Sequence, residues 1–247
     1  MDYKGYLICT DMDGTFSITD ENIKAIKEFQ EGGGLFTLAT GRNISYIEEV
    51  FSALEIKPNA PAVMCNGAVL YDYANRKILQ ENFINYKDYE MFLEVAEKFD
   101  VPLRLAQFGE TKELENIMVP HEGINPDKIY KAVWHTKDKL ETLKEYVTDK
   151  FGKDFELTQS CSSMLEVNKK GISKSSGTLF VKEYTKSHTL ICVGDYGNDI
   201  PMLKTADISY AVENAREDVK KAAMRVTVSN KDSAIARIIK DIGGEKC

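Results

Sequence analysis

Residues 5–15, GYLICTDMDGT, join a short apolar run to two aspartates, Asp11 and Asp13. An apolar run of about four to eight residues bounded by turn residues is typical of a buried strand. Strand-like and helix-like stretches alternate along the outer parts of the chain, which indicates a parallel sheet covered by helices. Because the carboxyl ends of parallel strands form the ligand-binding edge of such a sheet, we expect an α/β fold whose functional site begins at Asp11.

The two outer parts of the chain supply the strands of this sheet. HTLICVGD (188–195) repeats the pattern of an apolar run that ends in an acid, and Asn66-Gly67 is a turn between two strand-like runs in 61–72. Thr19 or Asp20 can cap the first helix, which Gly32 to Gly34 end. Further strands are expected over 34–40, 207–212 and 225–228, and helices over 45–54, 213–223 and 231–240.

The middle of the chain follows a different pattern. It predicts helices over 86–99 and 139–147 and strands over 101–107, 129–136, 155–160 and 163–167. Its own small core would contain Phe92, Val95, Leu103, Val133, Trp134, Leu143 and Leu165. We therefore expect residues 84–166 to be an inserted domain and residues 1–83 and 167–247 to form one interrupted domain.

Composition restricts the partners. The formal net charge of −7 argues against nucleic acid or an anionic membrane as the partner, and an anionic substrate would need local positive groups. No apolar run is long enough for a membrane helix, and the first residues lack the layout of a signal peptide. The five cysteines have no spacing typical of disulfides or zinc. A cytoplasmic protein with no membrane partner is expected.

Acids follow more than one predicted strand. Asp11 and Asp13 come after the first strand, and Asp195 comes after the run LICV. Crowded carboxylates repel one another, and a hard divalent cation such as Mg²⁺ relieves that repulsion. A solvated turn after an edge strand is the alternative for residues 11–15. In the segment 194–203, Asn198 and Asp199 stand where a helix begins, so Asp199 is also explained as a helix cap; that leaves Asp195 unexplained.

Two further segments are suited to a phosphate. Thr40-Gly41-Arg42 follows a predicted strand, so a hydroxyl, backbone N–H groups and a guanidinium would meet an anion there. Lys174 stands where a helix should begin after a glycine-containing turn, and could neutralise a phosphate and a nearby aspartate. Taken singly, Thr40 fits a helix cap and Lys174 a solvated surface lysine.

Taken together, these segments resemble the four motifs of the haloacid dehalogenase superfamily of phosphotransferases, in order and spacing over nearly the whole chain. The motifs carry Asp11 with Asp13, Thr40, Lys174, and Asp195 with Asp199. The chain looks most like the Cof-type sugar-phosphate phosphatases, which share TGR, the turn Asn66-Gly67-Ala68, GDxxND and an inserted cap. It departs from them at Phe16, at Glu213 in AVENA where the family has glycine, and in its short cap.

The resemblance implies a Rossmann-like parallel-sheet core with a smaller α/β cap, and a Mg²⁺-dependent phosphatase acting on a small phosphorylated metabolite such as a sugar phosphate. Asp11 would be the nucleophile that forms an aspartyl-phosphate, and Asp13 the general acid and base. Mg²⁺ would be held by the carboxylates of Asp11 and Asp195 and by the backbone carbonyl of Asp13, with Asp199 positioning this set. The phosphoryl group would be bound by Thr40, Gly41, Arg42, Lys174 and Asn198.

The cap would choose the substrate, and Arg104, Lys131 and Trp134 are the candidates for contact with it. A phosphohexomutase on the same fold and a non-enzymatic sensor of phosphorylated metabolites remain alternatives. A dinucleotide-binding oxidoreductase is excluded, because GxGxxG is absent after the first strand. The chain is expected to be a monomer or a small homo-oligomer.

Overall fold

The computed structural model describes residues 1–107, 125–136 and 138–244. Its central sheet is parallel and has the strand order β12-β11-β10-β1-β2. These strands span Tyr6–Thr10 (β1), Leu35–Leu38 (β2), Thr189–Gly194 (β10), Ile208–Ala211 (β11) and Arg225–Val226 (β12). Cys9 of β1 pairs with Cys192 of β10, and both side chains are fully buried. The sheet brings the ends of β1 and β10, and so Asp11 and Asp195, side by side, as the sequence predicted.

A second, antiparallel sheet continues from the edge of β2. Ala39 bridges to Val63 in parallel, which places β3 (Ala62–Met64) next to β2, and β3 pairs with β4 (Val69–Asp72) across a turn at Cys65–Gly67, labelled η1. This strand, turn and return strand were predicted. The sequence did not predict β5 (Lys77–Glu81), because this edge strand has few apolar residues and is half-buried at most.

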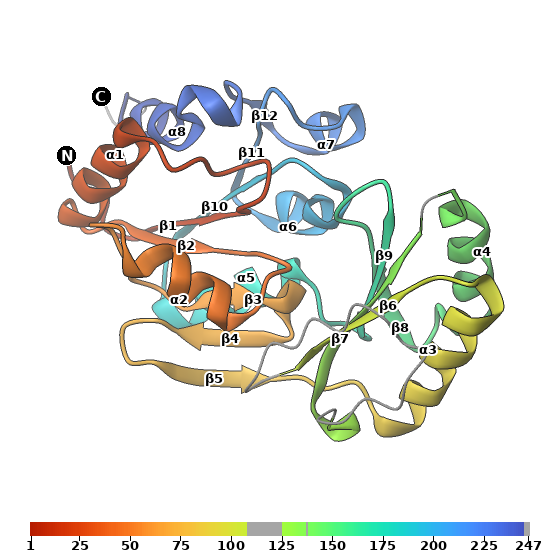
Figure 1. The fold of residues 1–247 in the computed structure, drawn as a ribbon. Coiled ribbons are helices and arrows are strands. Elements are labelled where there is room, and N and C mark those ends of the chain that lie inside the picture. Colours follow the sequence, from red (N-terminus) through yellow and green to blue (C-terminus); the bar gives the residue numbers. More distant parts are fainter. Residues whose placement is uncertain (108–124, 137, 245–247) are drawn as a thin grey trace.

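Helices cover the parallel sheet. Helix α1 (Asp20–Glu31), whose N-cap is Thr19, packs against α8 (Ala234–Gly244), and α5 (Lys174–Thr185) packs against α6 (Ile200–Thr205). Figure 1 shows these two pairs on opposite sides of the sheet. Helix α2 (Ile44–Ser52) follows β2, and α7 (Glu217–Ala222) follows β11. None of the helices in the described ranges is long and apolar enough to cross a membrane.

The insertion forms a separate layer that we call the cap (Figure 1). Its antiparallel sheet has the order β6-β7-β9-β8, with strands Leu103–Gln107, Ile129–His135, Met164–Lys169 and Phe155–Thr158 in that order. Helices α3 (Tyr86–Phe99) and α4 (Leu140–Phe151) pack on one face of it over a hydrophobic cluster. The predicted core residues belong to this cluster except Val133, which is buried but pairs with Arg104 and Glu166 on the other face of the sheet. The domain boundaries themselves stay a prediction.

Candidate active site

Lys174 lies between two aspartates at the carboxyl edge of the parallel sheet. Its Nζ atom donates to Asp11 Oδ1 at 2.6 Å and to Asp199 Oδ1 at 2.7 Å. The three side chains are at most 9% exposed. Lys174 is the first residue of α5, which Ser173 caps by accepting from the N–H of Ser176. The alternative of a solvated surface lysine is therefore wrong.

Asp195 and Asp199 are held in fixed orientations. Thr15 donates through Oγ1 to Asp195 Oδ1 at 2.8 Å, and Asp199 Oδ2 accepts from the backbone N–H groups of Asp195 and Tyr196 at 2.9 and 3.0 Å. Asp199 stands at the N-cap position of α6, but its side chain makes no capping bond to that helix. It is therefore more than a helix cap, because it fixes the loop that carries Asp195 and also binds Lys174.

The site carries more negative than positive charge. Burial raises the pKa of Asp11 above its ordinary value; the Lys174 ammonium opposes this rise, and the Asp199 and Asp195 carboxylates add to it. Burial and the charge of Asp199 raise the pKa of Asp195 to about 6. Burial alone would lower the pKa of Lys174, but its two carboxylate partners raise it, so the amine stays charged. Three carboxylates facing one ammonium form a site that favours a further cation.

These carboxylates also have the spacing of a metal site. One oxygen each of Asp11, Asp195 and Asp199 lies within 4.8 Å of the others. Mg²⁺ prefers a few carboxylate oxygens and retained waters, so the residues present fit this ion. The carboxylate of Asp13 is not part of this group, and the contribution of its backbone carbonyl stays a prediction.

The loop Thr40–Arg42 lies beside the same edge. Thr40 is buried, and its Oγ1 accepts from the N–H of Arg42 at 3.1 Å. Arg42 binds both carboxylate oxygens of Asp13, at 2.9 and 3.0 Å, and its guanidinium lies 4.7 Å from the centre of the Tyr46 ring. Asn198 is buried in the short turn Gly197–Asp199 that precedes α6, and its N–H donates to Gln159 O in the cap at 3.1 Å. The structure thus brings these predicted residues together around the acids, and their roles stay predictions.

The haloacid dehalogenase-like hydrolase family matches residues 8–115 and 107–239, which is most of the chain. The chain belongs to this family. It is 27% identical over 250 residues to 5-amino-6-(5-phospho-D-ribitylamino)uracil phosphatase YcsE of Bacillus subtilis, covering 95% of this chain and 94% of the relative. It is 25% identical over 276 residues to pyridoxal phosphate phosphatase YbhA of Escherichia coli, covering 94% and 97%.

A solved structure shows the same fold. A haloacid dehalogenase-like hydrolase from B. subtilis superimposes with a TM-score of 0.82 at 22% identity and covers 95% of this chain and 98% of its own. The predicted fold class and the predicted membership in the Cof-type phosphatase branch are both confirmed. The protein is accordingly an enzyme.

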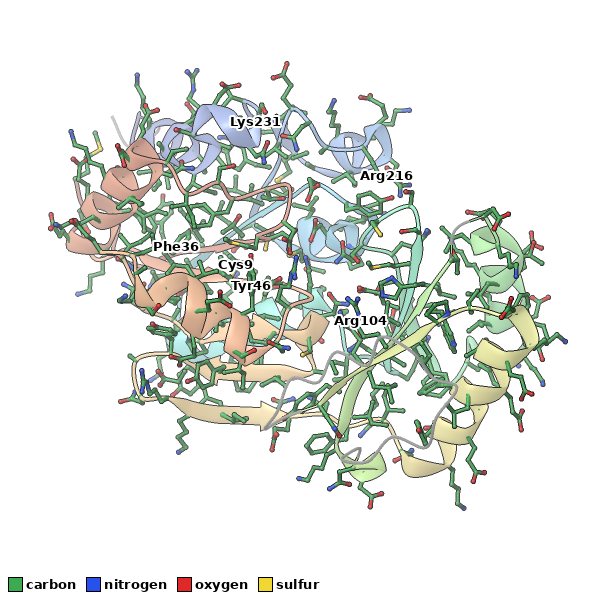
Figure 2. All side chains as sticks on the ribbon, in the orientation of Figure 1. Cys9, Phe36, Tyr46, Arg104, Arg216 and Lys231 are labelled. Carbon is green, nitrogen blue, oxygen red and sulfur yellow. The ribbon has the colours of Figure 1, made fainter. Side chains whose placement is uncertain are left out.

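One contact predicted for the cap of the present protein is wrong. Trp134 is fully buried on the helix side of the cap sheet, packs edge-on against Phe92, and donates through Nε1 to Phe92 O at 3.2 Å. The prediction that Trp134 contacts the substrate is wrong, because alternation along β7 directs it away from the core. Lys131 and Arg104 lie on the opposite face, where Lys131 reaches Gly41 O at 2.8 Å. Figure 2 shows Arg104 on the part of the cap next to the core.

Three residues at or near the site make contacts that the sequence did not predict. Thr15 orients Asp195, and Glu166 of β9 accepts from Asn66 of η1 at 2.6 Å. Glu166 had a detectable signal, since a charged residue between Leu165 and Val167 interrupts an apolar strand. Thr15 and Asn66 lie in stretches that the sequence singled out, but nothing local to them indicated which side chains they would contact.

Proposed function

We propose that this protein is a Mg²⁺-dependent phosphatase that hydrolyses a small phosphorylated metabolite through an aspartyl-phosphate on Asp11. The observation that supports this most is the buried contact of Lys174 with Asp11 and Asp199, beside Asp195. A binding protein for phosphate would need positive groups around the anion. It would have no use for a buried carboxylate such as Asp11 at the position where phosphorus must arrive.

The chain supplies the nucleophile and the acid and base for both steps. In the first, an Asp11 oxygen forms a bond to phosphorus while the bond to the leaving oxygen breaks, and Asp13 gives that oxygen a proton. In the second, Asp13 takes a proton from water, which attacks phosphorus and releases inorganic phosphate and free Asp11. Lys174 and the Thr40 loop hold the negative phosphoryl oxygens throughout. Phosphoryl transfer needs mainly such positioning and neutralisation of charge.

Asp11, Asp195 and Asp199 would hold or position the metal. When bound, Mg²⁺ would neutralise the negative charge of the phosphoryl oxygens and of the crowded carboxylates. Arg42 forms an ion pair with Asp13, and both side chains are about half exposed. An arriving substrate anion would compete for Arg42, which would release Asp13 for proton transfer.

The substrate is proposed to be a phosphate monoester of a sugar or of a sugar-like chain. The relative YcsE is named for a phosphoribityl compound and YbhA for pyridoxal phosphate, so relatives of similar identity act on chemically different leaving groups. Discrimination would rest with the cap face that carries Arg104, the same face from which Lys131 contacts Gly41 of the core.

The test is release of inorganic phosphate from a panel that includes p-nitrophenyl phosphate, hexose phosphates, 5-amino-6-(5-phospho-D-ribitylamino)uracil and pyridoxal phosphate, with Mg²⁺ and with excess EDTA. We expect phosphate release that requires Mg²⁺ and is absent in Asp11→Asn, with mass spectrometry excluding reversion of that variant to aspartate. Full activity in EDTA after dialysis would remove the metal assignment. Isomerised hexose phosphate without free phosphate would identify a mutase, and binding without turnover a sensor.

A further inference from the structure

A buried ion pair lies in the cap, outside the acidic site. Lys131 Nζ lies 3.3 Å from Glu166 Oε1, and the two side chains are only 9% and 4% exposed. Each partner also binds the core: Lys131 donates to the Gly41 carbonyl at 2.8 Å, and Glu166 Oε2 accepts from Asn66 Nδ2 at 2.6 Å. The pair therefore joins the cap to the core at two points.

Asn66 is hydrogen-bonded to the Thr40–Arg42 loop, which is expected to bind the phosphoryl group. Its N–H donates to Thr40 O at 3.0 Å, and the N–H of the preceding Cys65 donates to Arg42 O at 2.8 Å. Both turn residues have left-handed backbone angles, with φ of 51° at Cys65 and 57° at Asn66. Such angles are unfavourable for a residue like cysteine and persist where surrounding bonds hold them. The turn η1 and the Thr40–Arg42 loop are thus one bonded unit.

The same turn also touches the start of α5. Gly67 has a φ of +100°, and a Cβ atom there would lie 2.2 Å from Ser173 O, directly before Lys174. Asn168 of β9 donates to Cys65 O at 2.9 Å, so a further cap strand residue holds η1. A shift of the cap would therefore reach both the Thr40 loop and the helix end that carries Lys174.

The surroundings of the Lys131–Glu166 pair keep its buried carboxylate ionised and let the lysine approach the core. Burial alone would raise the pKa of Glu166, but the Lys131 charge and the hydrogen bonds from Asn66 and Ser160 hold it below its ordinary value. Lys131 approaches closely because residue 41 is glycine, where a Cβ atom would lie 3.2 Å from Lys131 Nζ and 3.1 Å from Asn66 Oδ1. Its ammonium faces a carboxylate and a carbonyl, which fits a role in joining the cap to the core.

We propose that Lys131, Glu166 and Asn66 form a latch that couples closure of the cap to the position of the Thr40–Arg42 loop. The three are positioning residues, and their effect on catalysis rests on the proposed function. With the latch formed, the loop lies where it can bind the phosphoryl oxygens. With the latch broken, the cap and the loop loosen together, and the site loses its fixed geometry although the acids remain.

The test exchanges the donor and the acceptor of the hydrogen bond between Asn66 and Glu166. Asn66→Asp has the same shape and tolerates the left-handed backbone, but sets a carboxylate against Glu166. Adding Glu166→Gln gives N66D/E166Q, in which the new amide can donate to Asp at 66 and its oxygen can still accept from Lys131. The net charge of the latch then equals that of the wild type. We expect N66D to lower kcat/KM at least tenfold and the double variant to recover at least half of that loss on a logarithmic scale.

Hydrogen exchange gives a readout that does not depend on activity. The amides of Cys65 and Asn66 should exchange at least tenfold faster in N66D, and should return toward the wild-type rate in N66D/E166Q. Inorganic phosphate should inhibit N66D less strongly, because the loop that binds it is loosened. Normal exchange and activity in N66D, or no rescue by E166Q, would overturn the latch.

A second set of variants applies if N66D does not fold. Lys131→Met and Glu166→Gln should each lower kcat/KM, and K131M/E166Q should lower it no further than the worse single variant, whereas additive losses would refute a joint role. Lys170→Met is the matched control, because its partner Glu156 is 3.8 Å away and Lys170 is 54% exposed; its activity should stay within twofold. If the wild type hydrolyses no substrate, the proposed function fails while the exchange experiment still judges the latch.

Discussion

Replacing Lys174 with methionine keeps a long side chain but removes the ammonium that lies 2.6 Å from Asp11 and 2.7 Å from Asp199. At an effective dielectric constant of 20, a contact at either distance with an ionised aspartate corresponds to about 6 kcal/mol of Coulomb attraction. Desolvation of the charges offsets most of this. Removing one partner of a buried pair costs about 3–5 kcal/mol, because the other charge stays buried and unpaired. We expect K174M to lower the free energy of unfolding by that amount near neutral pH in EDTA.

Thermal unfolding measures this loss. For a chain of this size, 1 kcal/mol corresponds to about 2–4 °C in Tm, so K174M should melt about 6–20 °C below the wild type. Lys182→Met is the control, since Lys182 lies at the same 2.6 Å from Asp207 but the two side chains are 27% and 42% exposed. A pair this exposed contributes at most about 1 kcal/mol. Equal losses in K174M and K182M would refute the argument that burial makes the Lys174 contacts strong.

The loss should also depend on pH and on the partner. Because the pKa of Asp11 is raised in the folded state, the metal-free protein favours its protonated form, and ionisation costs stability as pH rises. Removing the ammonium raises the pKa of Asp11 further, so K174M should be more destabilising at pH 9, above the wild-type Asp11 pKa of about 8, than at pH 6. K174M/Asp199→Asn should be more stable than K174M alone, because one unpaired charge is gone. A double variant that is less stable would contradict the assignment of repulsion as the cause.

Three further predictions concern acid–base catalysis, pH and the cap. Asp13→Ala should slow hydrolysis of a sugar phosphate by about 10²–10⁴-fold. It should spare the first step with p-nitrophenyl phosphate, whose leaving group needs little protonation, so rapid mixing should show a burst of nitrophenol. Equal slowing of both substrates without a burst would exclude Asp13 as the acid and base. In EDTA, Asp195→Asn should gain stability relative to the wild type as pH rises from about 4 to 6. The folded pKa of Asp195, about 6, lies above its unfolded value, so ionisation of Asp195 destabilises the native state of the wild type. Calorimetry across this range should show the gain, and a difference in stability that does not change with pH would contradict it. Arg104→Ala should change the ranking of substrates, whereas Trp134→Phe should lower Tm and leave the ranking unchanged; the reverse result would mean that the two faces of the cap sheet have been assigned wrongly.

Most of the elements could be predicted because their signals are local. The apolar run before Asp11, the Thr19 cap of α1 and the turn at Asn66-Gly67 each depend on a few neighbouring residues. Strand β5 was missed because an exposed edge strand needs little apolar character. Trp134 was assigned to the substrate because a large aromatic residue in a strand fits either face of a sheet. The face is set by the register of β7 with its neighbours, which composition does not reveal.

The sequence by itself determined that acids stand at the ends of β1 and β10 and that a lysine begins α5. It could do so because strand ends and helix starts are encoded within short segments. The tertiary structure decided which of these groups meet. Lys174 reaches Asp11 across 163 residues, Asn66 reaches Glu166 across 100, and Arg42 binds Asp13 rather than standing free for a phosphate. Such contacts depend on the order of the strands and on how the cap packs against the core. Burial then makes the ion pairs of Lys174 much stronger than the same pairs would be on the surface.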